Sequence, residues 1–64
     1  MHWDDYGDVL TVEELAKALR FSKQHIYQLV RVEAVPHFRV GNHIRFHKKA
    51  LIEWVEAGGS KDAM

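Results

Sequence analysis

The chain has 64 residues, no Cys, and nine Lys and Arg against nine Asp and Glu, so its formal net charge is zero. This length predicts a single domain of about three helices and a hairpin, and it excludes a multi-step catalytic pocket. The lack of Cys excludes disulfides and thiolate chemistry, and no apolar run resembles a membrane span or a signal peptide, so we expect a cytoplasmic protein.

The neutral total hides an uneven distribution of charge. Residues 17–49 carry eight Lys and Arg and one acid, a formal charge of +7, whereas residues 1–16 carry −5 and residues 50–64 carry −2. A small protein that concentrates its cations in one segment presents them to a polyanion. We divide the chain into an acidic N-terminal arm, a domain and a C-terminal tail at residues 1–9, 10–58 and 59–64.

The acidic arm contains two aromatic residues, Trp3 and Tyr6. Because a small core gains much from two aromatic side chains, we expect the arm to fold back and bury them. Two alternatives remain open. The arm competes with a polyanion for the basic segment, or its aromatic side chains anchor a protein partner.

The first predicted helix has a clear start. Thr11 and Glu14 have the spacing of a capping box, and Leu10 before the cap can meet Leu15 as a hydrophobic staple. Apolar residues then recur at helical spacing until the pattern breaks. We therefore expect a helix over residues 12–19, followed by a tight turn.

A second helix follows the turn. Ser22 is a candidate N-cap, and Ile26, Leu29 and Val30 have the spacing of a buried stripe, so we expect a helix over residues 23–33. At about 100° per residue, the opposite face is polar and free of acids. That face carries Gln24, Tyr27, Gln28 and Arg31.

Two short helices joined by a tight turn predict a helix-turn-helix unit, whose second helix reads DNA. Gln can pair with the edge of adenine, Arg with guanine or phosphate, and Tyr commonly donates to phosphate. For this helix taken alone, an ordinary solvated face is the alternative.

Residues 37–46 alternate apolar and polar side chains around a Gly-Asn dipeptide, which predicts a β-hairpin. A two-residue loop would place Phe38 opposite Arg45 and mix apolar with charged side chains on one face. A three-residue loop at 41–43 places Phe38 opposite Phe46 and gives one apolar face. We expect the three-residue loop.

The expected register sets Arg39 opposite Arg45, and like charges opposed across two strands are destabilising. A phosphate between or beside them would compensate, with Asn42 and His43 at the loop tip reaching the backbone or the minor groove and Lys48 just beyond. The alternative is that both arginines splay into water with little energetic penalty.

The last predicted helix covers residues 48–57. Leu51, Trp54 and Val55 form its buried stripe, and two glycines follow it as a stop. Trp54 could stack on a base, but its place in the apolar stripe favours a core position.

The histidines do not predict a metal site. On an extended strand, His43 and His47 lie about 13 Å apart, which is too far to share one ion. No nucleophile has a base at a recognisable spacing. We therefore predict a protein without metal or cofactor that is not an enzyme.

The order and spacing of these residues resemble the excisionase-type DNA-binding domains, a branch of the MerR-like winged helix-turn-helix proteins. The resemblance covers residues 10–57 and rests on Leu10-Thr11-Val12-Glu13-Glu14, Ser22 with Tyr27, Pro36, Arg39-Val40-Gly41 with Arg45-Phe46, and Leu51 with Trp54. It implies a winged helix-turn-helix fold, mainly α with a small β-hairpin, with the second helix in the major groove and the hairpin as a wing. The family often has glycine where this chain has Arg20.

The resemblance assigns Ser22, Lys23, Gln24, Tyr27 and Arg31 to the recognition helix and Arg39 and Arg45 to the wing. The helix periodicity adds Gln28, and the hairpin and the basic residues after it add Asn42, His43 and Lys48 to the candidate DNA contacts.

The resemblance implies sequence-specific binding of double-stranded DNA. We expect an excisionase-like recombination directionality factor that bends DNA, assists an integrase or recombinase, and binds cooperatively in tandem copies. Such a factor would be encoded by a bacterium, a phage or another mobile genetic element, and would associate with the nucleoid. A small autonomous transcription regulator is the alternative, and a protein-interaction adaptor that has lost DNA binding is less favoured.

Overall fold

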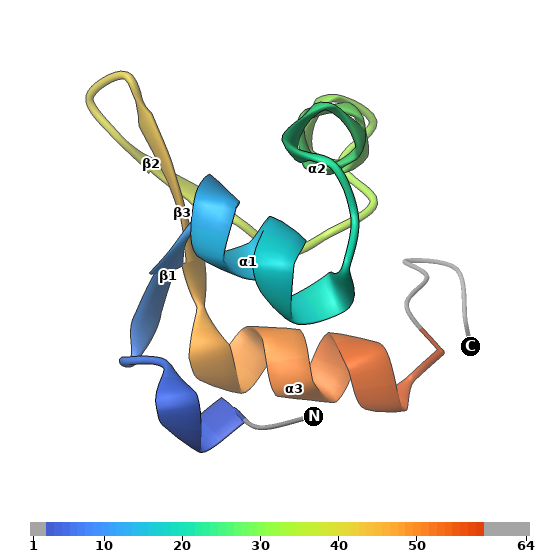
Figure 1. The fold of residues 1–64 in the computed structure, drawn as a ribbon. Coiled ribbons are helices and arrows are strands. Elements are labelled where there is room, and N and C mark those ends of the chain that lie inside the picture. The colour runs from blue at the N-terminus through green and yellow to red at the C-terminus, as the bar shows by residue number, and fades with distance from the viewer. Residues whose placement is uncertain (1–2, 59–64) are drawn as a thin grey trace.

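The computed structural model describes residues 3–58, which form three α-helices and one three-stranded antiparallel sheet (Figure 1). In chain order the elements are the 3-10 turn η1 (Trp3–Asp5), β1 (Val9–Thr11), α1 (Val12–Leu19), α2 (Lys23–Arg31), β2 (Phe38–Val40), β3 (His43–His47) and α3 (Lys48–Glu56). This architecture confirms the predicted winged helix-turn-helix fold. The predicted tail at 59–64 and the first two residues of the predicted arm lie outside the described residues.

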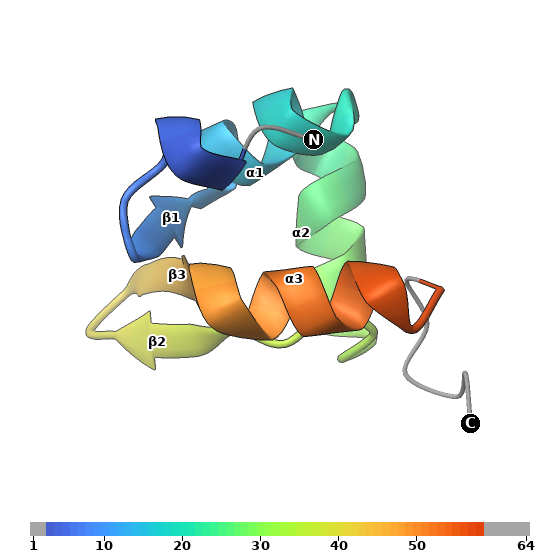
Figure 2. The same cartoon turned by 90° about the horizontal axis from the view of Figure 1, so that it is seen from below.

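The hairpin and α2 project from the same side of the molecule. Figure 1 shows the tip of the β2–β3 hairpin and α2, which is seen nearly end-on, at the top of the view, with α1 between them and α3 below. Figure 2 shows the sheet on one side and α2 on the other, with α3 running between them. No loop residue separates β1 from α1 or β3 from α3, so both junctions hold the sheet directly against the helices.

Side-chain caps start the first two helices where the sequence predicted. The backbone N–H of Glu14 donates to Thr11 Oγ1 at 3.1 Å, and the backbone N–H of Thr11 donates to Glu14 Oε1 at 3.0 Å. At α2, the backbone N–H of His25 donates to Ser22 Oγ at 3.1 Å. These local bonds satisfy orphan donors at each helix start, and they confirm the capping box and the second cap.

A left-handed residue ends α1. Arg20 has φ 60° and ψ 37°, and the N–H of Phe21 donates back to the carbonyl of Ala16 at 2.9 Å. This is a Schellman motif, in which glycine is the usual left-handed residue. The conformation explains why the resembling family often has glycine at this place.

The same motif ends α2 two residues earlier than predicted. Glu33 has φ 55°, and the N–H of Ala34 donates to the carbonyl of Leu29 at 2.8 Å. A left-handed residue cannot continue a right-handed helix, so α2 ends at Arg31. The prediction of helix 23–33 counted the residues of the cap as helix.

The sheet contains a strand that the sequence did not predict. The order is β1-β3-β2, so β3 is central and pairs with β1 as well as with its hairpin partner. β1 has three residues and passes straight into the capping box. A strand this short has no detectable alternation. Val9 falls in the predicted arm, and Leu10 and Thr11 belong to the predicted staple and capping box.

The predicted hairpin register was wrong. The structure pairs Phe38 with Arg45 and Val40 with His43 across a two-residue loop, in which Gly41 has φ 62°. A positive φ at the first loop residue suits the primed turns that join two-residue hairpins. The expected pairing of Phe38 with Phe46 does not form, because the two-residue loop shifts β2 by one residue relative to β3.

The changed register separates the two wing arginines. Arg39 pairs with Ile44, whereas Arg45 pairs with Phe38, so the two Cβ atoms point to opposite faces of the sheet. The predicted like-charge pair is therefore absent. Phe38 lies outside the core. Its ring stacks on His47 on the outer face of the sheet, with 4.5 Å between ring centroids.

One hydrophobic core joins the sheet to the three helices. Its buried residues are Leu10, Val12, Leu15, Ala16, Ile26, Val30, Val35, Phe46 and Leu51. Trp3, Tyr6 and Trp54 are half-buried against it, which confirms that the arm folds back and that Trp54 belongs to the core rather than to an exposed stacking surface. Among the described residues, no helix is long and apolar enough to cross a membrane.

Candidate nucleic-acid interface

The outer face of α2 is polar and exposed. Gln24, Tyr27, Gln28 and Arg31 are all exposed, and Tyr27 leaves 48% of its surface open to solvent. The opposite stripe is buried in the core, so the orientation of α2 is determined by its apolar residues. The four side chains therefore lie on a surface that a large ligand can reach.

A first hollow lies between the start of α2, the start of α1 and the hairpin tip. It has a volume of about 230 Å³. Its walls are formed by Thr11, Val12, Glu13, Lys23, Tyr27, Asn42, His43, Ile44 and Arg45. The hollow thus brings Lys23 of α2 together with Arg45 of the hairpin, although 22 positions separate them in the chain.

A second hollow lies on the other side of Tyr27, between the end of α2 and the hairpin. It has a volume of about 470 Å³. Tyr27, Val30, Arg31, Glu33, His37, Arg39 and Ile44 line it. Here Arg31 of α2 and Arg39 of the hairpin share one concave surface.

Tyr27 is therefore a ridge between two similar sites. Each hollow combines one cation from α2 with one from the hairpin, and Tyr27 lines both. Lys23 and Arg31 are eight residues apart on one helix, about 12 Å along its axis. The surface therefore has one pair of cations on each side of the Tyr27 phenol.

An acidic side chain accompanies the cations in each hollow. In the first, Lys23 Nζ lies 3.4 Å from Glu13 Oε2, and both side chains are more than half exposed. In the second, Glu33 lines the hollow together with the two arginines. Sequence reasoning missed both acids and also His37, because the packing of α1 and of the segment after α2 brings them to this surface, and no periodic pattern shows that packing.

The other predicted contact residues lie in different environments, and not all of them are free to bind a ligand. Asn42 and His43 are exposed at the hairpin tip, and the Arg45 guanidinium donates to the carbonyl of Ile44 at 2.8 Å. Ser22 uses its hydroxyl to cap α2. Lys48 lies away from both hollows, because its ammonium donates to the carbonyl of Tyr6 at 3.1 Å.

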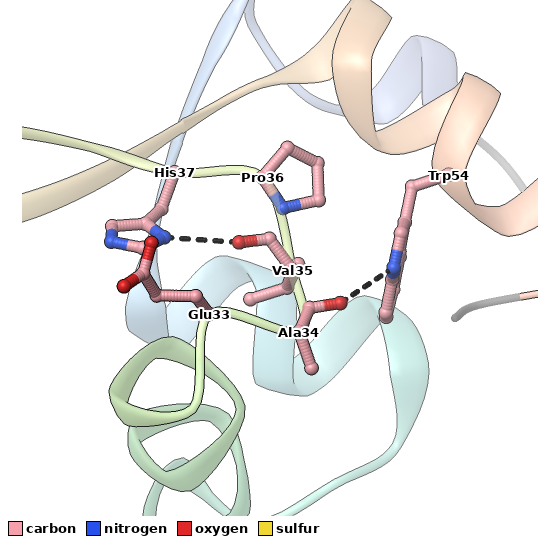
Figure 3. Close-up of a pocket in the computed structure, with 6 residues that line it drawn as sticks. All are labelled: Glu33, Ala34, Val35, Pro36, His37 and Trp54. Carbon is pink, nitrogen blue, oxygen red and sulfur yellow. Dashed lines mark hydrogen bonds between the residues drawn. The ribbon is translucent and has the colours of Figure 1, made fainter. Parts of the chain in front are cut away.

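The segment between α2 and the hairpin is tied to α3. The indole N–H of Trp54 donates to the carbonyl of Ala34 at 2.8 Å (Figure 3). His37 Nδ1 lies 3.0 Å from the carbonyl of Val35, and since a carbonyl can only accept, the ring nitrogen donates. These bonds hold the hairpin in a defined position relative to α2.

The histidines take part in aromatic contacts. The ring of His25 stacks on Phe21 with 4.3 Å between centroids, as His47 does on Phe38. Within residues 3–58, no three His, Asp or Glu side chains gather closely enough to hold a metal ion.

Two proteins of Mycobacterium tuberculosis, "Putative DNA-binding protein Rv0500A" of strain ATCC 25618 / H37Rv and "Putative DNA-binding protein MT0521" of strain CDC 1551 / Oshkosh, are each 42% identical to this chain over 48 residues. These matches cover 75% of this chain and 62% of each relative, so the chain spans less than two thirds of the relatives' length. No solved structure matches it.

A family model described as a helix-turn-helix domain matches residues 9–59. The match includes every helix and strand from β1 to α3, together with both hollows. The resemblance found in the sequence is thereby confirmed at the level of the family. The chain belongs to this helix-turn-helix domain family.

Proposed function

We propose that this protein binds double-stranded DNA through α2 and the β2–β3 hairpin, which acts as a wing. The observation that carries the proposal is Tyr27 between two hollows that each combine a helix cation with a hairpin cation. A DNA strand is a regular line of phosphates, and paired cations on both sides of a ridge suit such a ligand. The family and the names of the two relatives support the same function.

In this arrangement the exposed face of α2 enters the major groove. Gln24 and Gln28 then reach base edges, where an amide can pair with adenine. Tyr27 donates to the backbone that runs over it, and Lys23 adds a cation at the same strand. Ser22 contributes through the helix start that it caps.

The hairpin follows the backbone beside the groove. Arg39 and Arg45 lie in different hollows and contact phosphates on either side of the Tyr27 ridge, while Asn42 and His43 at the tip reach the backbone or the minor groove. Lys48 is not part of this contact surface, because it is bound to the arm. Arg31 can serve either a base or a phosphate.

The experiment that tests DNA binding is a selection from random duplexes, followed by a salt titration on the selected site and on an unrelated duplex. With Lys23, Arg39 and Arg45 at phosphates, the logarithm of the binding constant should fall with the logarithm of salt at a slope of about −2.7. The slope should be about −3.6 if Arg31 also contacts a phosphate. Discrimination of about 10³-fold or more would mark specific recognition. Lack of binding at low salt would refute the proposal.

For the biological role, we propose an excisionase-like recombination directionality factor that bends DNA, binds in tandem copies and assists an integrase. The sequence resemblance supports this role. A circular-permutation mobility assay on the selected site tests bending, and footprinting tests tandem occupancy. A single unbent site upstream of a gene would favour the transcription regulator instead.

A further inference from the structure

Glu33 is the only acid between residues 17 and 49, a segment of formal charge +7. The structure places this acid at the surface where the cations gather. It lines the second hollow together with Arg31 and Arg39. An acid at a surface that binds a polyanion opposes binding, so its position needs a reason.

The fold does not need this side chain. The bonds that close α2 are made by the backbone, from the N–H of Glu33 to the carbonyl of Val30 at 3.0 Å and from the N–H of Ala34 to the carbonyl of Leu29 at 2.8 Å. Glu33 adopts φ 55°, a conformation that glycine takes without steric penalty. Glutamate is therefore an unfavourable choice for the backbone at this position.

The Glu33 carboxylate is not neutralised by an ion pair with its neighbours. Among residues 3–58 the single ion pair within 4.0 Å joins Lys23 to Glu13, in the other hollow. Figure 3 shows Glu33 and His37 on one side of the connecting segment and Trp54 on the other. Glu33 is exposed and lines the second hollow, and no ion pair among the described residues neutralises its charge.

We propose that Glu33 determines specificity by directing Arg31 to a base edge instead of a phosphate. This inference rests on the proposed DNA binding. A phosphate that enters the second hollow meets the carboxylate as a like charge, whereas the edge of guanine is uncharged and offers two acceptors to a guanidinium. A duplex without the right base can use Arg31 only at a phosphate, and Glu33 penalises that contact.

The proposal predicts a loss of discrimination when the charge is removed. In Glu33→Gln, affinity for unrelated duplex should rise about threefold to tenfold, the size of one like-charge contact near a surface. Affinity for the selected site should change less than twofold. The salt slope on unrelated duplex should steepen by about one unit, because one more phosphate contact forms.

Three further variants separate charge from backbone effects. Glu33→Gly removes the charge and the backbone strain, so it should raise the melting temperature and match Glu33→Gln on DNA. Glu33→Asp keeps a carboxylate and should preserve most of the discrimination. Glu56→Gln makes the same charge change on α3, outside both hollows, and should leave DNA binding unchanged.

A combined substitution tests the link to Arg31. In the parent chain, Arg31→Ala should abolish the preference at one base position. In the Glu33→Gln background, it should instead weaken binding to all duplexes by a similar factor. An unchanged single-position effect in both backgrounds, or a Glu33→Gln affinity equal to that of Glu56→Gln, would overturn the inference while DNA binding stands. Absence of binding by the parent chain would refute the proposed function itself.

Discussion

Replacing Arg20 by glycine should stabilise the protein. Arg20 has φ 60° at the end of α1, and an L-residue in the left-handed region is disfavoured by about 1 to 2 kcal/mol. Glycine gains freedom in the unfolded chain, which offsets about 0.5 to 1 kcal/mol of that relief. We expect a net increase of about 0.5 to 1 kcal/mol in the free energy of unfolding.

Thermal unfolding followed by circular dichroism measures this change. In a domain of this size, 1 kcal/mol corresponds to about 4 to 8 °C, so the midpoint should rise by about 2 to 8 °C. Lys17→Gly is the matched control, because it makes the same change in charge on the same helix at a position with helical φ. It should destabilise by about 1 kcal/mol. If Arg20→Gly lowered the midpoint as the control does, residue 20 would not be left-handed in solution.

Two other substitutions and one deletion test contacts described above. Trp54→Phe keeps an aromatic ring but leaves the carbonyl of Ala34 without its donor, and urea titration should show a loss of about 1 kcal/mol; no loss would mean that water replaces the indole. Deleting residues 1–8 removes two half-buried aromatic side chains and should lower the free energy of unfolding by about 1 to 3 kcal/mol. If the stability were unchanged and non-specific DNA binding became tighter, the arm would instead compete with DNA for the cationic surface. Arg45→Ala should flatten the salt dependence of DNA binding by about one unit without changing base preference, and an unaltered slope would remove the first hollow from the interface.

Local chemistry explains which parts of the fold were predictable. Thr11 and Ser22 cap their helices with bonds to residues three positions away, so a short stretch of sequence contains the whole signal. The sheet register depends on residues far apart. The sequence correctly indicated that Phe46 faces the core, but its partner is Leu10 of an unpredicted strand rather than Phe38 of the hairpin.

The candidate interface was predictable to a similar degree. Helical periodicity identified the exposed face of α2, because burial of the apolar stripe determines which side chains face the solvent. The pairing of Lys23 with Arg45 and of Arg31 with Arg39 depends on the angle of the hairpin, which no local pattern encodes. The left-handed conformation that brings Glu33 into its hollow was equally hidden, because glutamate is not a usual residue there.

Because the junctions at β1–α1 and β3–α3 are direct, the length of the β2–β3 hairpin can change without changing how the helices pack on the sheet. With no loop at either junction, a change in chain length there would rotate a helix relative to the sheet, whereas the Gly41–Asn42 turn joins only β2 to β3. Adding two residues to each strand at the turn would extend the hairpin by about 7 Å and, because strand faces repeat every second residue, leave Ile44 and Phe46 facing inward. The length of the hairpin can therefore change at its tip without altering the core that folds the domain.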